Sequence, residues 1–559
     1  MKNQPQEPNR RAFLSQAGVA GAVTLAAGSI GIEPLLQTTR SQVHAAAPTG
    51  SNQRANACAK LRRDAATAGL QATPQNLQHP NNNDEDLYPS KLGNFSKGLP
   101  HNDDGTVVLS AYEALVKALN SGVPADFDAI PLGGARVLTN PQSGLAFDME
   151  GPDAQSLVQP PAPAFASRQQ AAEISENYWM ALLRDVPFSQ YAANAIANAA
   201  AADLTLYGSD FSGPTNGGAV TTGALFRGRT SGDLKGPFIS QFFYQDCNFG
   251  AQKLDQRIRT AMPGINYMTD FATWLSVQRG VNQAADVFDP VPRYIRSGRD
   301  MGQWVHVDVL FQAYFQAFLV LAGANAPFDD GNPYNNNPTQ TGFGTFGGPH
   351  LATLLCEVAT RALKAVWYQK WFVHRRLRPE VHAARVHRTL FAGAGYPVHS
   401  EILTSFNDAN RLGGHMPPGN ALLPIAFPEG SPTHPAYGAG HATVAGACVT
   451  ILKSWFKEST RLVDIGLLPL EPTDDGLNLA PYTGADAGSL TVGGELNKIA
   501  SNVANGRNIA GVHWRSDANE SLKLGEQIAI GILRDQRSCY NEVFNGFSLT
   551  KFDGTTITV

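Results

Sequence analysis

Cysteine is scarce in this chain and is not arranged in a recognised metal-binding pattern. The 559 residues include five widely separated cysteines: Cys58, Cys247, Cys356, Cys448 and Cys539. The absence of a CxxC pair and of Cys/His ligand spacing argues against a thiolate zinc or redox motif. Because the number is odd, at least one thiol stays unpaired within a monomer. Cys356 and Cys448 lie in apolar helical stretches, where we expect core positions.

The chain also lacks a basic excess and a long hydrophobic run. Its formal net charge is −4 and only 16% of its residues are charged, which argues against nucleic acid as a partner. Residues 17–32 form a mild Ala/Gly/Val stretch that is too short and too weakly apolar to anchor in a membrane. We therefore expect neither a nucleic-acid partner nor a membrane partner.

Paired arginines, Arg10 and Arg11, precede this stretch, and small residues at 45–47 offer a cleavage site. The arrangement is typical of a twin-arginine signal, which exports folded proteins from bacteria. A resident N-terminal anchor helix is the alternative. We predict that residues 1–47 are the signal and that the mature protein is bacterial and periplasmic or secreted.

Strand-like alternation is scarce, whereas apolar positions recur at helical spacing over most of residues 106–559. We predict a mainly α fold of helical bundles there, forming one catalytic domain. A polar segment at 48–105 precedes it and reads as an extended arm that can wrap a neighbouring subunit. Long loops at 203–240, 325–349 and 457–490 are expected to form the rim of an active-site cleft.

Three separated segments place titratable side chains at predicted helix ends. In the first, a Gly-rich turn leads into an apolar helix at Gly440, with His441 at its start and His434 seven residues earlier. Free N–H groups at a helix start favour an anion, and glycine permits its close approach. The alternative is a loop that enters a core helix and carries histidines on its rim.

The second segment, residues 370–388, is the densest basic cluster. Pro379 predicts a helix end near Arg378, so Lys370 and Arg378 lie about 12 Å apart along one helix and their side chains can converge. A solvated basic face is the alternative. We assign residues 374–376 to structural ion pairs.

The third segment lies near the C-terminus. Gly506 is expected to end one helix and Ser516 to cap the next, which leaves Arg507 and His513 on the connecting turn. Asp517 can hold the His513 imidazole in one tautomer and raise its basicity. A helix cap with a surface salt bridge is the alternative.

Taken together, the segments offer three cations, a backbone N–H donor and two imidazoles. The cations of Lys370, Arg378 and Arg507 would repel one another unless an oxyanion with two or more negative charges lay between them. One imidazole can then bond to the central atom while the other moves protons.

At these residues the chain resembles the vanadium-dependent haloperoxidases, in particular the algal bromoperoxidases and their bacterial relatives. The family's K-x7-R-P element matches residues 370–379, its S-G-H element matches 439–441, and its G-R-x5-H element matches 506–513. The resemblance covers most of residues 170–540. One position departs from the family, because Ala439 replaces the usual serine and removes one hydroxyl hydrogen bond to the oxyanion.

The resemblance implies two four-helix-bundle-like cores and a vanadate cofactor, with His513 as the axial vanadium ligand. It also implies catalytic roles: His441 is the general acid/base, Lys370 polarises the peroxide, and His434 tunes the pocket or helps to place the halide. The implied vanadate-binding residues are Lys370, Arg378, Ala439, Gly440, His441, Arg507 and His513.

The implied reaction uses hydrogen peroxide to oxidise halide to hypohalous acid, which halogenates organic acceptors. By this resemblance, His434 favours bromide and iodide over chloride as substrates. The algal bromoperoxidases carry a histidine at this position, whereas the fungal chloroperoxidases, which resemble the same stretch, carry an aromatic residue. Relatives form dimers or larger assemblies, so we expect a homo-oligomer, from a dimer up to a dodecamer.

A loop beginning at Phe328 could hold a structural calcium ion, as in some algal relatives; an ordinary Asx-rich turn is the alternative.

Two other functions remain open from the residues alone. The same anion site belongs to acid and lipid phosphatases, in which His513 would be a nucleophile that forms a phospho-histidine and His441 the leaving-group acid. The other alternative is an exported protein that stores oxyanions without turnover.

Overall fold

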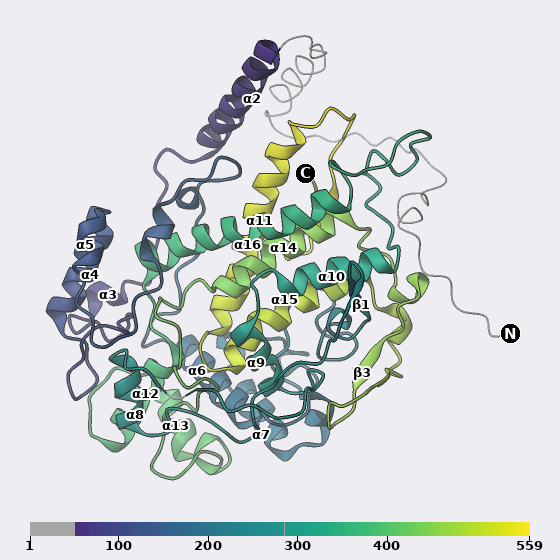
Figure 1. Cartoon of the computed structure of the whole chain (residues 1–559). Helices are drawn as coiled ribbons and strands as arrows, with labels where there is room; N and C mark the ends of the chain where they lie inside the picture. The colour runs from purple at the N-terminus through teal and green to yellow at the C-terminus, as the bar shows by residue number, and fades with distance from the viewer. Residues whose placement is uncertain (1–50, 284) are drawn as a thin grey trace.

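The computed structural model of the chain describes residues 51–283 and 285–559. The predicted export signal, residues 1–47, lies outside these residues. Helices make up most of the regular structure (Figure 1), which confirms the mainly α class.

The helices vary from one turn to more than six turns. Their bounds are α2 (Ser51–Ala72), α3 (Asp84–Leu87), α4 (Leu109–Ser121), α5 (Pro124–Asp128), α6 (Arg168–Leu182), α7 (Ala195–Thr205), α8 (Phe271–Gln278), α9 (Gly298–Val307), α10 (Gln312–Gly323), α11 (Gly348–Tyr368), the π-helix η7 (Gln369–His374), α12 (Pro379–Phe391), α13 (Ser400–Asn407), α14 (Gly440–Trp455), α15 (Val492–Ile509) and α16 (Arg515–Arg537).

Strands are short and form separate antiparallel pairs at the periphery. The pairs are β1 (Cys247–Phe249) with β2 (Gln252–Leu254), β3 (Leu470–Pro472) with β4 (Leu479–Pro481), and β5 (Ser548–Thr550) with β6 (Thr556–Thr558). Each pair closes a local hairpin.

Helix α14 is the centre of the fold. Every residue of it except His441 is buried, and it packs against α11, α15 and α16 (Figure 1). Its close approach to α16 depends on two glycines, because an added Cβ would come within 2.0 Å of a backbone oxygen at Gly446 and within 1.9 Å at Gly525. A helix that is apolar or small on all sides is expected in such a position.

The four helices α11, α14, α15 and α16 form one bundle-like group. A second, separate bundle stays a prediction, because buried side chains from Leu92 to Val559 make one continuous core that includes α6, α9 and α12. A smaller cluster lies between α4 and η7 and contains Phe95 and Trp371.

Three predicted helix boundaries near the site are wrong. The cap of the last helix, α16, is Trp514 and not Ser516, which lies in the first turn. The helix that carries Lys370 does not run to Arg378: α11 changes to the wider turn of η7, which ends at His374 and is followed by Arg375 as a C-cap with a left-handed φ of 39°. Arg378 is instead the extended N-cap of α12, consistent with the proline after it. Gly506 lies inside α15, where the missing side chain lets α9 approach, since an added Cβ would be 3.1 Å from Met301.

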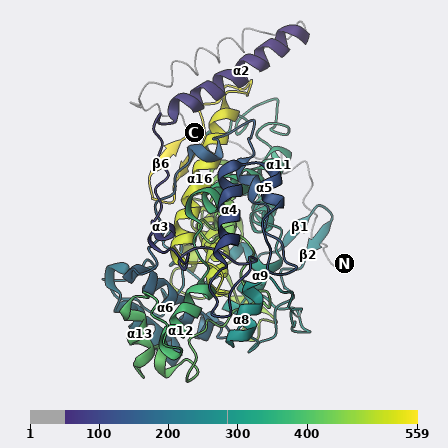
Figure 2. The ribbon, with the colours of Figure 1, turned by 90° about the vertical axis from the view of Figure 1, so that its left-hand side faces the viewer.

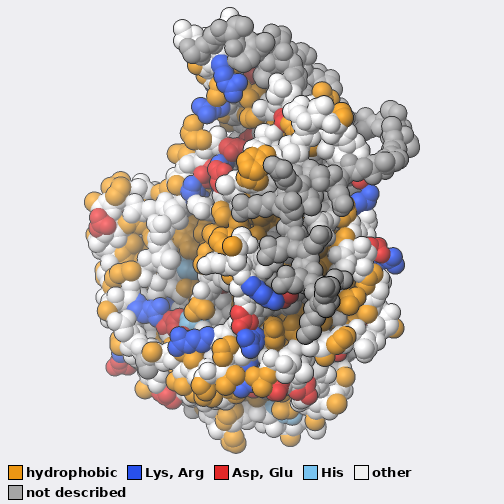
Figure 3. All heavy atoms as spheres, turned by 45° about the vertical axis from the view of Figure 1, so that its right-hand side comes forward, with side chains coloured by type: hydrophobic (Ala, Val, Ile, Leu, Met, Phe, Trp, Pro, Cys, Tyr) orange, Lys and Arg blue, Asp and Glu red, His pale blue; other side chains and the backbone are white. Residues whose placement is uncertain are grey.

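The arm predicted at 48–105 is not extended throughout, because it begins with helix α2. Figures 1 and 2 show this helix standing away from the body, and Figure 3 shows Lys and Arg side chains on the projecting part. None of the side chains from Asn52 to Ala72 is buried. Residues after Ala72 return to the body, where Phe95 and Leu99 enter the smaller core.

Within the described ranges, no single helix has the length and apolarity to cross a membrane. The one combination with that composition is α9 with α10, and their axes are bent by 102°.

Candidate functional site

The three segments singled out in the sequence meet at the ends of the central helices. Lys370 comes from η7, Arg378 from the N-cap of α12 and Gly440 from the first turn of α14. Arg507 lies in the last turn of α15, and His513 lies on the turn before α16. The fold thus brings together residues that are up to 143 positions apart in the chain.

Arg378 joins the two other segments directly. Its Nη1 donates to the Val512 carbonyl at 2.7 Å and to His513 Nε2 at 3.0 Å. Its Nη2 donates to His434 Nδ1 at 2.9 Å and to the His434 carbonyl at 2.7 Å. One guanidinium therefore holds both histidines in place.

The other two cations are held by neutral groups. Lys370 Nζ donates to the carbonyls of Pro435 and Ala436 at 2.9 and 3.2 Å. Arg507 Nη1 donates to the Val305 carbonyl at 2.7 Å, and the guanidinium lies 5.3 Å from the Phe427 ring centroid. The buried Nε of Arg507 has no hydrogen-bond partner within the described chain.

These three cations are buried, and over residues 51–283 and 285–559 none of them forms an ion pair with a carboxylate. Burial, with repulsion from Arg378 and Arg507, holds the pKa of Lys370 well below its usual range. Burial lowers the pKa of Arg378 to about 9 and that of Arg507 to about 10. A multiply charged anion would relieve this desolvation and repulsion, so the residues fit an oxyanion such as vanadate.

His513 is oriented by a buried carboxylate, as predicted. Asp517 Oδ2 lies 2.8 Å from His513 Nδ1, and Asp517 Oδ1 accepts from Arg376 at 2.8 Å. Because Asp517 holds the proton on Nδ1, the Nε2 lone pair points to Arg378 and is available to a metal. Burial, together with repulsion from Arg378 and Lys370, keeps the pKa of His513 well below its usual range. The imidazole is therefore neutral, as a ligand must be.

A residue that the sequence did not indicate, Asp308, contacts the second imidazole. Its Oδ1 lies 2.9 Å from His441 Nε2. The Asp308 side chain is 3% exposed, whereas that of His441 is 19% exposed. Asp308 directly follows α9 and is 133 residues from His441, so no local spacing pattern could have identified the pair.

His434 is buried against Trp367, with their ring centroids 4.8 Å apart. Burial, reinforced by Lys370 and Arg378, holds its pKa well below the usual range, so it is a neutral hydrogen-bond partner. The structure therefore places His434 beside the three-cation cluster.

Ala439 and Gly440 form the start of α14. Ala439 is an N-cap without a side-chain cap, and its N–H donates to Ser521 Oγ at 2.7 Å. A Cβ on Gly440 would lie 3.2 Å from the Trp367 ring. The absence of a side chain at Gly440 therefore lets the Trp367 ring pack closely against the start of α14. The N–H groups of the first turn lack the capping hydroxyl that a serine at 439 would offer.

The remaining predictions have mixed outcomes. Arg375 and Arg376 form half-buried and buried ion pairs with Glu85 and Glu173, as expected. The same assignment is wrong for His374, because within the described chain it forms no ion pair and both of its buried ring nitrogens lack a hydrogen-bond partner. The contacts that hold the site come from residues 305–308, 434–436 and 512, rather than from the three long loops predicted as its rim.

The loop that begins at Phe328 forms Asx turns, which were the alternative to a calcium site. Asn332 Oδ1 accepts from Tyr334 N at 3.0 Å, and Asn337 Oδ1 accepts from Thr339 N at 3.0 Å. Asp330 pairs with Lys457 at 2.9 Å. Among the residues that the structure describes, no group of three or more His, Cys, Asp or Glu side chains is placed to hold a metal ion.

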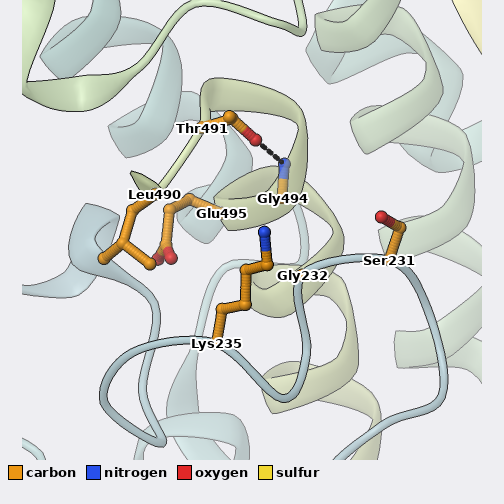
Figure 4. Close-up of a pocket in the computed structure, with 7 residues that line it drawn as sticks. All are labelled: Ser231, Gly232, Lys235, Leu490, Thr491, Gly494 and Glu495. Carbon is orange, nitrogen blue, oxygen red and sulfur yellow. Dashed lines mark hydrogen bonds between the residues drawn. The ribbon is translucent and has the colours of Figure 1, made fainter. Parts of the chain in front are cut away.

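A surface depression at the start of α15 is distinct from this site. Figure 4 shows its lining, which includes Lys235 and Glu495 and in which the Gly494 N–H donates to Thr491 Oγ1 at 3.1 Å. Along α15 it lies about 18 Å from Arg507, at the opposite end of the helix. It therefore belongs to the helix cap and not to the cation cluster.

Comparison with known proteins identifies the family. A model of the second helical-bundle domain of VCPO matches residues 351–542, which contain all three segments. Vanadium-dependent bromoperoxidases from Corallina pilulifera and Ascophyllum nodosum are 37% and 34% identical, over 87% and 94% of this chain and 94% and 97% of the relatives. A homohexameric vanadate-dependent bromoperoxidase structure from Ascophyllum nodosum superposes with a TM-score of 0.84 and 30% identity, over 96% of this chain and 94% of that one. The chain therefore belongs to the family of vanadium-dependent haloperoxidases.

Proposed function

We propose that the protein is a vanadate-dependent peroxidase that uses hydrogen peroxide to oxidise bromide and iodide. The product, hypohalous acid or its equivalent, would halogenate organic acceptors. The observation that carries this proposal is a set of three buried cations that, among the described residues, have no carboxylate ion-pair partner and lie around a neutral His513 imidazole.

Each side chain has a role that follows from its contacts. His513 Nε2 would bind vanadium, and Lys370, Arg378, Arg507 and the Gly440 N–H would neutralise the oxyanion charge. Bound vanadate would supply a Lewis acid that activates peroxide for attack by halide. Lys370 would polarise the peroxide by hydrogen bonding.

His441 would accept the peroxide proton and return a proton to the leaving oxygen. Asp308 holds its Nε2 and stabilises the protonated imidazole, so proton transfer uses the other ring nitrogen. The exposure of His441 allows exchange with solvent, whereas His513 is sealed inside the fold. This difference supports a proton-transfer role for His441 and metal ligation by His513.

His434 supports bromide and iodide as substrates. Its neutral ring lies against Trp367 and is held by Arg378, so it lines the cation cluster without adding a charge. A halide placed there would meet a polar imidazole rather than the aromatic side chain of the fungal chloroperoxidases.

Bromination of a phenol dye tests the proposal. The chain, incubated with vanadate, should brominate the dye only when peroxide and bromide are both present. Phosphate-ester hydrolysis without bromination would instead establish the phosphatase alternative, and vanadate binding with no turnover would establish storage. A His441→Ala variant should lose bromination and retain vanadate binding; full activity in this variant would contradict the proton-transfer role.

We further propose twin-arginine export to the periplasm or the medium and assembly into a homo-oligomer. The paired arginines support export, and the homohexamer formed by the Ascophyllum nodosum relative supports assembly. Cell fractionation tests export: the wild-type chain should appear in the periplasm or the medium, whereas an Arg10→Lys, Arg11→Lys double variant should stay in the cytoplasm. Light scattering of the purified chain tests the second, and a monomer would contradict it. Calcium is not part of this proposal.

A further inference from the structure

Arg507 is held by fewer hydrogen bonds than Arg378, although both are buried cations of the site. All three nitrogens of the Arg378 guanidinium donate to groups of the protein. Arg507 Nη1 donates to the Val305 carbonyl at 2.7 Å, and its buried Nε has no partner within the described chain. The direction of the Arg507 guanidinium therefore depends strongly on its other neighbour, the ring of Phe427.

The Phe427 ring lies between two groups that come from different helices. The Arg507 guanidinium of α15 is 5.3 Å from the ring centroid. The His306 imidazole of α9 stacks on the same ring, with the centroids 3.8 Å apart and the planes inclined by only 10°. Because flat stacking at this distance is lost when either ring turns, the imidazole restricts the orientation of the Phe427 ring. One buried aromatic ring thus connects His306 to Arg507.

The His306 imidazole is itself held by carboxylates on two sides. Its Nε2 lies 2.7 Å from Glu429 Oε1, and its Nδ1 lies 3.4 Å from Asp286 Oδ2. His306 also directly follows Val305, whose carbonyl accepts the hydrogen bond from Arg507. Both groups that hold the guanidinium are therefore either adjacent to His306 in the chain or stacked on its ring.

The parts of the fold that hold His306 are anchored in turn. The Glu429 carbonyl accepts from the buried Lys97 Nζ at 2.7 Å. The end of α9 packs against α15, where an added Cβ on Gly506 would lie 3.2 Å from the Val305 side chain. The imidazole therefore lies between two fixed segments and can transmit their position to the ring that it covers.

We propose that His306 is a positioning residue for the oxyanion: its ring fixes Phe427, and Phe427 holds the Arg507 guanidinium in the orientation that binds the anion. The role rests on the proposed function, in which the oxyanion is vanadate. His306 acts through Phe427 and does not itself bind the anion. Without the imidazole, Arg507 would have more orientations available before binding, and the anion would have to order it.

Calorimetric titration of the full chain with vanadate tests this role through two substitutions at one position. His306→Gln keeps a hydrogen-bond donor for Glu429 but removes the ring, so vanadate should bind roughly three- to tenfold more weakly. His306→Phe keeps a flat ring on Phe427 but removes the donor, so its affinity should stay within about twofold of the wild type. Wild-type affinity in His306→Gln, or an equal loss in both variants, would overturn the proposal.

A control and a double variant separate this role from a general loss of packing. His415 is also half-buried and lies against an aromatic ring, that of Trp179, with the centroids 5.1 Å apart. His415→Gln should therefore leave vanadate affinity unchanged, and an equal loss there would overturn the proposal.

Arg507→Lys removes the planar guanidinium through which His306 acts. In this background His306→Gln should cause little further loss of affinity, whereas the full additional loss would show that His306 does not act through Arg507. A wild-type chain that binds no vanadate would instead reject the proposed function, and the inference with it. Wild-type binding with no effect of His306→Gln would reject the inference alone.

Discussion

Asp517 offers the sharpest test of how the proposed vanadium ligand is held. Its carboxylate is fully buried, accepts from His513 Nδ1 at 2.8 Å and also accepts from Arg376 at 2.8 Å. Asp517→Asn has the same shape and keeps one acceptor oxygen. However, the substitution removes the negative charge. It also places an NH₂ group opposite one of the two donors, His513 Nδ1 or Arg376, from which the carboxylate now accepts a hydrogen bond.

Two magnitudes follow from these contacts. Loss of a carboxylate that orients a metal-binding histidine typically weakens metal binding by about 10- to 100-fold, or roughly 1.4–2.7 kcal/mol. The free energy of unfolding should fall by about 2 kcal/mol, less than the roughly 3–5 kcal/mol of a fully broken buried pair. The loss is smaller because Arg376 keeps its bond to Glu173 at 2.9 Å.

Glu173→Gln is the matched control. Glu173 shares Arg376 with Asp517 and also accepts from the Ser516 N–H at 2.9 Å, and none of its contacts involves His513. Its replacement should reduce stability by a similar amount and leave vanadate affinity unchanged. Calorimetric titration with vanadate measures the affinity, and urea unfolding without vanadate measures the stability. The reasoning fails if Asp517→Asn binds vanadate as tightly as the wild type, or if Glu173→Gln loses as much affinity.

Three further predictions concern other residues. Ala439→Ser supplies the hydroxyl that the family usually has, so vanadate should bind about fivefold more tightly, or ~1 kcal/mol; unchanged affinity in a calorimetric titration would contradict this. Asp308→Asn should keep vanadate binding, lower kcat roughly 10- to 100-fold and shift the pH profile of bromination, because His441 loses its charged partner; a wild-type profile would count against the role. Burial lowers the pKa of His382 to about 3, so the unfolded chain takes up a proton that the folded one excludes, and stability is lost as pH falls from 6.5 towards 3. His382→Phe should reduce the loss of unfolding free energy between pH 6.5 and 5 by about 2 kcal/mol, measured by urea unfolding; an equal loss in both proteins would refute it.

Residue types and short-range patterns were sufficient for much of the site. Helical spacing predicted the fold class, and the pattern Ala439-Gly440-His441 predicted the start of α14 at Gly440. The four-residue interval between His513 and Asp517 predicted a contact that the structure shows at 2.8 Å. These features depend on neighbours within one helical turn, and such interactions are readable along the chain.

The errors arose where packing overrides local preference. Gly506 has the usual character of a helix terminator, but α15 continues through it because α9 needs the space. Residues 369–374 have a regular helical pattern, yet they adopt a π-helix that moves Lys370 and Arg378 onto different elements. In both places the local cost is outweighed by buried contacts that the sequence pattern does not record.

The sequence by itself determined the inventory of the site: three cations, two imidazoles and a glycine-led helix start, at intervals typical of the family. Only the tertiary structure decided which groups meet, because contacts between distant segments depend on how whole helices pack. It paired His441 with Asp308 and, among the residues that the structure describes, left the three cations without an ion-pair carboxylate. Buried charge becomes costly only when the fold removes water from it, and that cost is the physical reason for expecting an anion there.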